Sequence, residues 1–169
     1  MEEIDYLGSS IRRWQVGAST FSPWPQAGAR LINWDITYPD GTFRDIIIWP
    51  ELSDEREVVK ARGGNPILFP FPARRTFRQG EINFWEDSEG TKRPMPMHGI
   101  ARQGQFELTR IAETGFAAHF LPDQNALDVY PYNYDFEVLY RFEEMALTVE
   151  LQLHSNDKIP IPWSAGHHF

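Results

Sequence analysis

The chain has 169 residues, of which 41% are hydrophobic and 14% aromatic, so it is long and apolar enough for one folded domain with a substantial core. Its 24 acidic and 16 basic residues give a net charge of −8, which argues against nucleic acid or an anionic membrane as the partner. The absence of cysteine excludes disulfides, thiolate catalysis and zinc–sulfur sites. With neither an apolar leader at the acidic start nor a long apolar run, we predict a cytoplasmic protein.

The first predicted elements form a hairpin. Residues 29–38 combine partial alternation with aromatic and β-branched side chains, and Pro39, Asp40 and Gly41 then supply a turn. A second strand is predicted over residues 42–49, so the pair is antiparallel. Ser53 could cap a short helix over residues 54–60.

Strands dominate the rest of the chain. Two strands are predicted over residues 106–111 and 116–121, joined by a polar turn at Glu113, Thr114 and Gly115. Residues 134–142 and 146–156 alternate strictly between polar and apolar, and they form the strongest antiparallel ladder in the sequence. We therefore predict that residues 1–169 form a single, mainly antiparallel all-β domain. Periodicity alone does not distinguish a β-sandwich from a β-barrel.

Two segments are unlike ordinary core-building sequence. Residues 60–70 hold Arg62, two consecutive glycines, two prolines and an Ile-Leu-Phe run, which together suggest a constrained turn pinned against a core. Residues 97–102 place His98 and Arg102 around another glycine. An imidazole and guanidinium groups are suited to binding a polar, oxygen-rich small molecule.

These segments also carry a family resemblance. Residues 62–70 resemble the RGGIPVLFP signature of the aldose 1-epimerase (galactose mutarotase-like) superfamily, in its hexose-6-phosphate mutarotase branch. Residues 97–102 are similar to that branch's HGFAR segment, and residues 161–169 resemble the family's MPFSLGFHPYF segment. The three matches are in order and cover most of the chain from about Gly28 onward.

The resemblance implies a mainly antiparallel β-sandwich, the galactose mutarotase-like supersandwich, with a concave sheet that holds the sugar. In that family the third motif lies near the middle of the domain, and a carboxylate general base lies near the C-terminus. We therefore expect residues 1–169 to correspond to the N-terminal portion of a family domain. The sandwich would be incomplete, and its exposed sheet edges would favour self-association.

The resemblance also implies which residues act in catalysis. Mutarotation opens and recloses a hemiacetal, which takes one acid and one base and neither a cofactor nor a metal. His168 aligns with the histidine of HPYF and is the predicted general acid, since imidazole titrates near neutral pH. His98 is predicted to lie in the sugar pocket and contact substrate oxygens. His167 falls at an apolar family position and is predicted to be structural.

Three arginines are the predicted substrate-binding residues. Arg62 and Arg102 lie in the motifs, and Arg75 lies beside Arg74 on a loop expected at the pocket mouth. Guanidinium groups there could bind sugar hydroxyls or a phosphate. The alternatives are an ion pair of Arg62 with a nearby glutamate and a solvated loop at Arg75.

Other candidates are assigned to structure. His119 and His154 lie in alternating strands away from the motifs, and core packing is favoured over sugar stacking for Trp85 and Trp163.

The predicted function is an aldose 1-epimerase-like isomerase that interconverts the anomers of an aldose or a hexose 6-phosphate, with a small-molecule sugar or sugar phosphate as partner. The alternatives are a non-catalytic carbohydrate-binding protein and an inactive fragment that lacks the base. If the chain is active alone, its base is to be sought among residues such as Glu81, Glu86 and Asp135.

Overall fold

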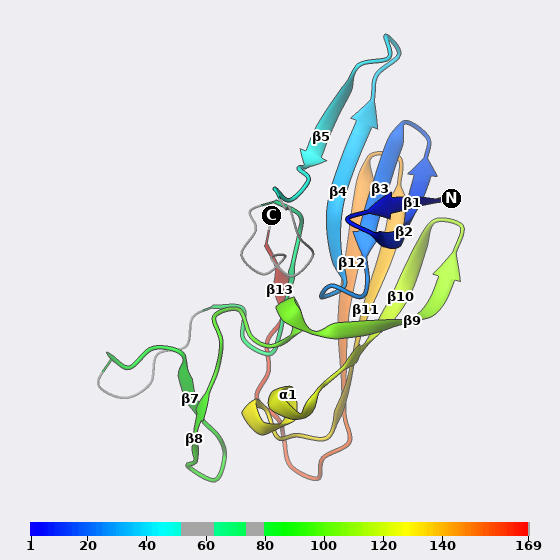
Figure 1. Ribbon diagram of the computed structural model, residues 1–169. Coiled ribbons are helices and arrows are strands. Elements are labelled where there is room, and N and C mark those ends of the chain that lie inside the picture. The colour runs from blue at the N-terminus through cyan, green and yellow to red at the C-terminus, as the bar shows by residue number, and fades with distance from the viewer. Residues whose placement is uncertain (52–62, 74–79, 169) are drawn as a thin grey trace.

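The computed structural model describes residues 1–51, 63–73 and 80–168. The fold is all-β and mainly antiparallel, as predicted, and two larger sheets build it (Figure 1). The five-stranded sheet follows the chain in the order β1 (Glu2–Tyr6), β2 (Ser9–Val16), β3 (Ser19–Trp24), β4 (Arg30–Thr37) and β5 (Phe43–Ile47). The four-stranded sheet has the order β12 (Ala146–Ser155), β11 (Tyr134–Glu143), β10 (Gly115–Leu121) and β9 (Gln105–Ala112).

The predicted hairpins are all present. Strands β4 and β5 pair antiparallel, as do β9 with β10 and β11 with β12. Strand β11 alternates fully, because Tyr134, Phe136, Val138, Tyr140 and Phe142 are buried and the residues between them face outward. The predicted helix over residues 54–60 lies outside the described residues.

Aromatic side chains join the two sheets. Phe21 on β3 stacks on Phe142 on β11 with ring centroids 4.5 Å apart. Trp14 on β2 packs on Phe116, and its indole N–H donates to the carbonyl of Ala112 at 3.0 Å. Each buried ring of this kind contributes about 1.5–3 kcal/mol, so this layer of aromatics accounts for much of the sandwich's cohesion.

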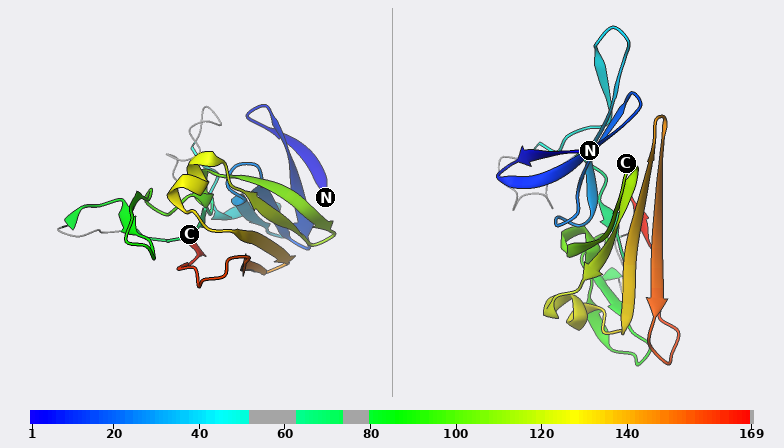
Figure 2. Two further views of the ribbon diagram at one scale, coloured as in Figure 1. Left: turned by 90° about the horizontal axis from the view of Figure 1, so that it is seen from below. Right: turned by 90° about the vertical axis from the view of Figure 1, so that its right-hand side faces the viewer.

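Smaller elements surround one end of the sandwich. Strand β6 (Ile67–Leu68) pairs with β13 (Gly166–His167), and β7 (Phe84–Glu86) pairs with β8 (Lys92–Pro94) in a hairpin that projects from the body (Figures 1 and 2). Helical segments within the described residues include η3 (Ala101–Gln103) and α1 (Gln124–Val129). In the part of the chain that the structure describes, neither is long or apolar enough to cross a membrane.

Candidate functional site

The glycine-rich segment is tied to the five-stranded sheet. The Gly64 N–H donates to the carbonyl of Ile48 at 2.8 Å, and the Asn65 N–H donates to that of Leu31 at 2.7 Å. Gly63 has φ = 94°, and a Cβ there would lie 2.8 Å from a backbone oxygen. Only glycine fits such a close approach, so Gly63 allows the segment before β6 to lie against the residues that follow β5.

The loop that carries His98 is tied in turn to the residue after β6. Gly99 has φ = 80°, and a Cβ there would overlap the carbonyl oxygen of Phe69. That oxygen accepts a hydrogen bond of 2.7 Å from the Ile100 N–H. His98 itself has φ = 72°, an uncommon conformation for a residue other than glycine and one that recurs at functional sites.

The last segment lies on the other side of β6. Strand β13 pairs with β6, with Gly166 opposite Leu68 and His167 opposite Ile67. The His168 N–H then donates to the carbonyl of Pro66 at 3.3 Å. The three segments singled out in the sequence are therefore adjacent in space.

This arrangement brings His98 and His168 together. Their ring centroids are 5.4 Å apart with an interplanar angle of 42°. Nδ1 of His98 contacts the backbone carbonyl oxygen of Pro72. Since a carbonyl can only accept, Nδ1 carries a proton in this contact, and in the tautomer with a single ring proton Nε2 is the acceptor.

His167 points to the core instead. Its Nδ1 lies 2.7 Å from Nδ2 and 3.1 Å from Oδ1 of Asn65, whose side chain is fully buried. Burial lowers the pKa of His167 from its usual 6.5. The contact anchors β13 to the core, so adjacent histidines face different surroundings.

Arg102 lies in η3 beside a second arginine. Arg30 is only 1% exposed, and its Nη2 donates to the backbone oxygen of Arg102 at 3.4 Å. Burial and then the Arg102 charge lower the pKa of Arg30 to about 10, and burial also lowers the pKa of Arg102. Two cations in a partly dry environment favour an anion nearby. The predicted site residues Arg62 and Arg75, with Arg74, lie outside the described residues.

The tryptophans considered for sugar stacking differ. Trp85 is buried, and its indole N–H donates to the carbonyl of Val129 at 3.1 Å, so it belongs to the core. Trp163 is 41% exposed, with its ring 6.4 Å from that of Phe69, and it is not a core residue.

The remaining titratable candidates lie elsewhere. His119 Nε2 is 3.8 Å from Oδ1 of Asp135 on the outward face of the four-stranded sheet, and His154 is opposite Asp135 in the ladder. Glu81 pairs with Lys92 at 2.7 Å. Among the described residues no carboxylate hydrogen-bonds to the ring of His98 or His168. The same residues contain no group of three or more His, Asp or Glu able to hold a metal ion.

Sequence reasoning missed two participants. Arg30 stands at the start of a predicted strand, where an arginine is ordinarily exposed, so nothing indicated a buried partner for Arg102. The carbonyl of Pro72 fixes the His98 ring, and a backbone contact of that kind leaves no signal in the residue types.

The glycine-rich segment, the loop that carries His98 and strand β13 thus meet at one place in an all-β fold. Residues 23–169 match the family described as aldose 1-epimerase, and the chain belongs to that family.

Solved structures show the same fold at low sequence identity. A galactose mutarotase related enzyme from Lactobacillus acidophilus matches with a TM-score of 0.75 and 16% identity, covering 94% of this chain and 47% of that one. A galactose mutarotase-like protein from Clostridium acetobutylicum matches with a TM-score of 0.75 and 15% identity, covering 99% and 52%. An aldose epimerase homologue from C. elegans matches with a TM-score of 0.65 and 15% identity, covering 86% and 46%. The chain therefore spans about half the length of these relatives. No curated protein matches it.

Proposed function

We propose that this protein is an aldose 1-epimerase-like isomerase that interconverts the α and β anomers of an aldose by ring opening. The observation that supports it most is the meeting of His98 and His168, from two separate motifs, with centroids 5.4 Å apart. The family of the chain supplies the expected substrate class, a small-molecule sugar.

The proposed reaction needs one proton removed and one supplied. A base takes the proton from O1, the O1–H electrons form the C1=O1 bond, and the C1–O5 bond breaks. His168 gives its proton to O5 as that bond breaks. Rotation about C1–C2 and the reverse transfers then close the ring on the other face. His98 contributes Nε2, which accepts a hydrogen bond from a sugar hydroxyl and orients the substrate.

The proposed base is a carboxylate in the half of the relatives' domain that this chain does not span. Without it both proton transfers cannot be assisted, so the 169-residue chain by itself should exchange anomers no faster than buffer does. Polarimetry of freshly dissolved α-D-glucose with this chain tests the point. Clear exchange would mean that the base lies within residues 1–169. If the full gene product also binds sugar saturably without exchanging its anomers, the carbohydrate-binding function is favoured instead.

We further propose that the substrate is a hexose 6-phosphate, with Arg62, Arg75 and Arg102 as its phosphate-binding residues. The partly desolvated Arg102, beside the buried Arg30, supports this choice because such cations favour a phosphate. The full gene product should prefer glucose 6-phosphate to glucose at low salt and lose part of that preference at high salt, since exposed charges are screened. Equal turnover of the two sugars at low ionic strength would remove the phosphate assignment and leave a general aldose epimerase.

A further inference from the structure

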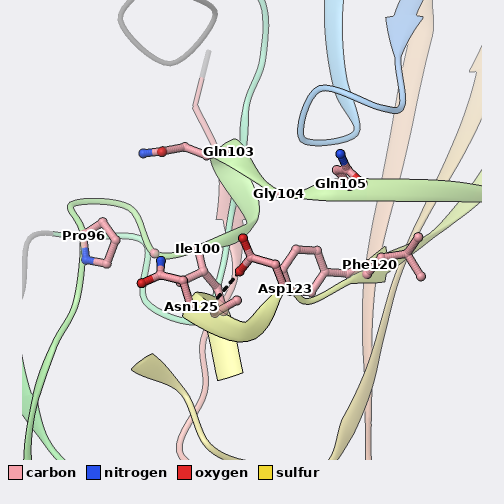
Figure 3. A pocket seen from close by; sticks show the side chains of 11 residues that line it. Pro96, Ile100, Gln103, Gly104, Gln105, Phe120, Asp123 and Asn125 are labelled. Atoms are coloured by element: carbon pink, nitrogen blue, oxygen red, sulfur yellow. Dashed lines mark hydrogen bonds between the residues drawn. The ribbon is translucent and has the colours of Figure 1, made fainter. Parts of the chain in front are cut away.

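A cavity of about 330 Å³ opens between the loop that carries His98, η3 and the start of α1 (Figure 3). This volume is within the range of roughly 300–1,000 Å³ typical of small-molecule sites. Residues from two stretches of the chain, 96–105 and 120–126, line it, among them Pro96, Ile100, Gln103, Gln105, Asp123 and Asn125. Of these, only Ile100 lies within a sequence motif, and none was predicted to be a site residue.

The polar lining consists mainly of side-chain amides. Gln103, Gln105 and Asn125 are exposed at the cavity, and each offers paired donors and an acceptor. Asp123 is the single charged residue among the described residues that line it, and one of its oxygens accepts from the Ala126 N–H at 2.8 Å. Such a lining suits the hydroxyl groups of an uncharged ligand and disfavours an anion.

One wall is apolar and depends on a glycine. Phe120 is buried beside Gly104, and a Cβ at Gly104 would overlap the Phe120 ring. Gly104 has φ = −80° and ψ = 163°, an extended conformation open to any residue. The backbone conformation therefore does not require glycine at position 104. Glycine is required there because any side chain would overlap the Phe120 ring. Phe120 itself is only 1% exposed, so the apolar surface that a ligand would meet is that of Pro96 and Leu121. Amides beside such a surface match a polyhydroxylated molecule with one apolar face.

The cavity is distinct from the histidine pair. Gly99 and Ile100 line it, but the His98 side chain is directed to Pro72 and His168 instead. We propose that this cavity is a second binding site, for an uncharged polyhydroxylated small molecule such as a monosaccharide. The proposal does not depend on the isomerase activity.

The test is a ¹H–¹⁵N NMR titration of the full chain with D-glucose, with glucose 6-phosphate as the anionic comparison. The side-chain NH₂ signals of Gln103, Gln105 and Asn125 should shift together and saturate, with weak affinity of millimolar order because the ligand is small. Glucose 6-phosphate should shift them less at equal concentration, since the Asp123 carboxylate repels the phosphate.

Variants separate this site from the histidine pair. The double variant Gln103→Ala/Asn125→Ala changes only exposed side chains and should abolish the glucose shift at Gln105 and Gly104. Gln15→Ala, at an exposed glutamine on β2, is the matched control and should leave the glucose-induced shifts unchanged. His98→Asn should also leave these shifts unchanged. Unsaturable shifts, shifts that survive the double variant, or shifts lost in His98→Asn would each overturn the proposal.

Discussion

At the scale of single residues, the backbone of His98 is the most unusual feature of the histidine pair. Its positive φ is held by the hydrogen bond from its ring to Pro72 and by the contact of Gly99 with Phe69. A residue in this conformation costs of order 1–3 kcal/mol unless its type tolerates it, and asparagine tolerates it better than alanine.

Two substitutions at His98 distinguish the role of its imidazole ring from the energetic cost of its backbone conformation. His98→Asn and His98→Ala both remove the imidazole, so both should lower the rate of anomer exchange by the full gene product. His98→Ala should in addition lose about 1 kcal/mol more stability than His98→Asn, because alanine strains the left-handed conformation. Urea unfolding of both variants measures the difference, and equal stability would mean that the strained φ is not retained in solution.

His167 predicts a dependence of stability on pH. Its pKa in the folded chain is lowered from 6.5 by burial, so the unfolded chain binds the proton more tightly. Stability should therefore be unaffected above pH 6.5 and should fall as the pH drops from 6.5 through the lower pKa of the folded chain. His167→Gln should flatten this part of the pH profile in urea unfolding, whereas the exposed His154→Gln should not. If the stability of His167→Gln falls with pH as steeply as that of the parent chain, the pH dependence comes from another group.

At the scale of elements, Gly99 fixes the distance between the His98 loop and the residue after β6. Gly99→Ala combines a positive φ with a clash against Phe69, whereas Gly41→Ala has a similar φ of 82° and no atom within 4 Å. Gly41→Ala should cost about 1 kcal/mol and Gly99→Ala at least twice as much, since the clash must move the backbone. Chemical denaturation compares the two, and a loss at Gly99 no larger than at Gly41 would show that the loop adapts freely.

The elements also show how far sequence could predict this fold. Strands β11 and β12 were predictable because polar and apolar residues alternate along both and a short turn at Glu144 and Met145 joins them. The strands β1, β2 and β3 were not predicted. In β2 only Ile11 and Trp14 are buried, and the remaining positions other than Val16 are polar or charged. Helix α1 has only six residues, too few to establish a helical period.

The candidate site, like the fold, could be predicted only in part, but here the prediction came from motif resemblance and not from periodicity. No periodicity joins His98 to His168, and only the resemblance of their motifs placed both in one pocket. The structure puts their rings in contact, while the roles proposed for them remain predictions. The orientation of His98 and the approach of Arg30 to Arg102 depend on backbone oxygens, which no residue pattern reveals.

At the scale of the whole molecule, the four-stranded sheet ends at β12, its outer edge strand (Figure 2). Four apolar side chains of this strand pack on the core and stay only half-buried: Leu147, Val149, Leu151 and Leu153. An open edge next to partly exposed apolar side chains is a template for pairing with another strand.

The 169-residue chain should therefore self-associate in a concentration-dependent way. Thr148→Lys/Gln152→Lys adds charge on the outward face of β12 and should reduce association, because antiparallel pairing of two copies brings the like charges together. Analytical ultracentrifugation of both proteins measures this. A parent chain that stays monomeric across the accessible concentrations would show that the edge is protected.

The most direct measurement for the central claim is the anomer-exchange rate of the full gene product with and without His168. Polarimetry should find exchange slowed by about 10²–10⁴-fold in His168→Gln, the usual contribution of a general acid. His154→Gln, at an exposed histidine on β12, should leave the rate unchanged. A loss below about threefold in a folded His168→Gln protein would contradict the account, because such a loss is far smaller than general acid catalysis contributes.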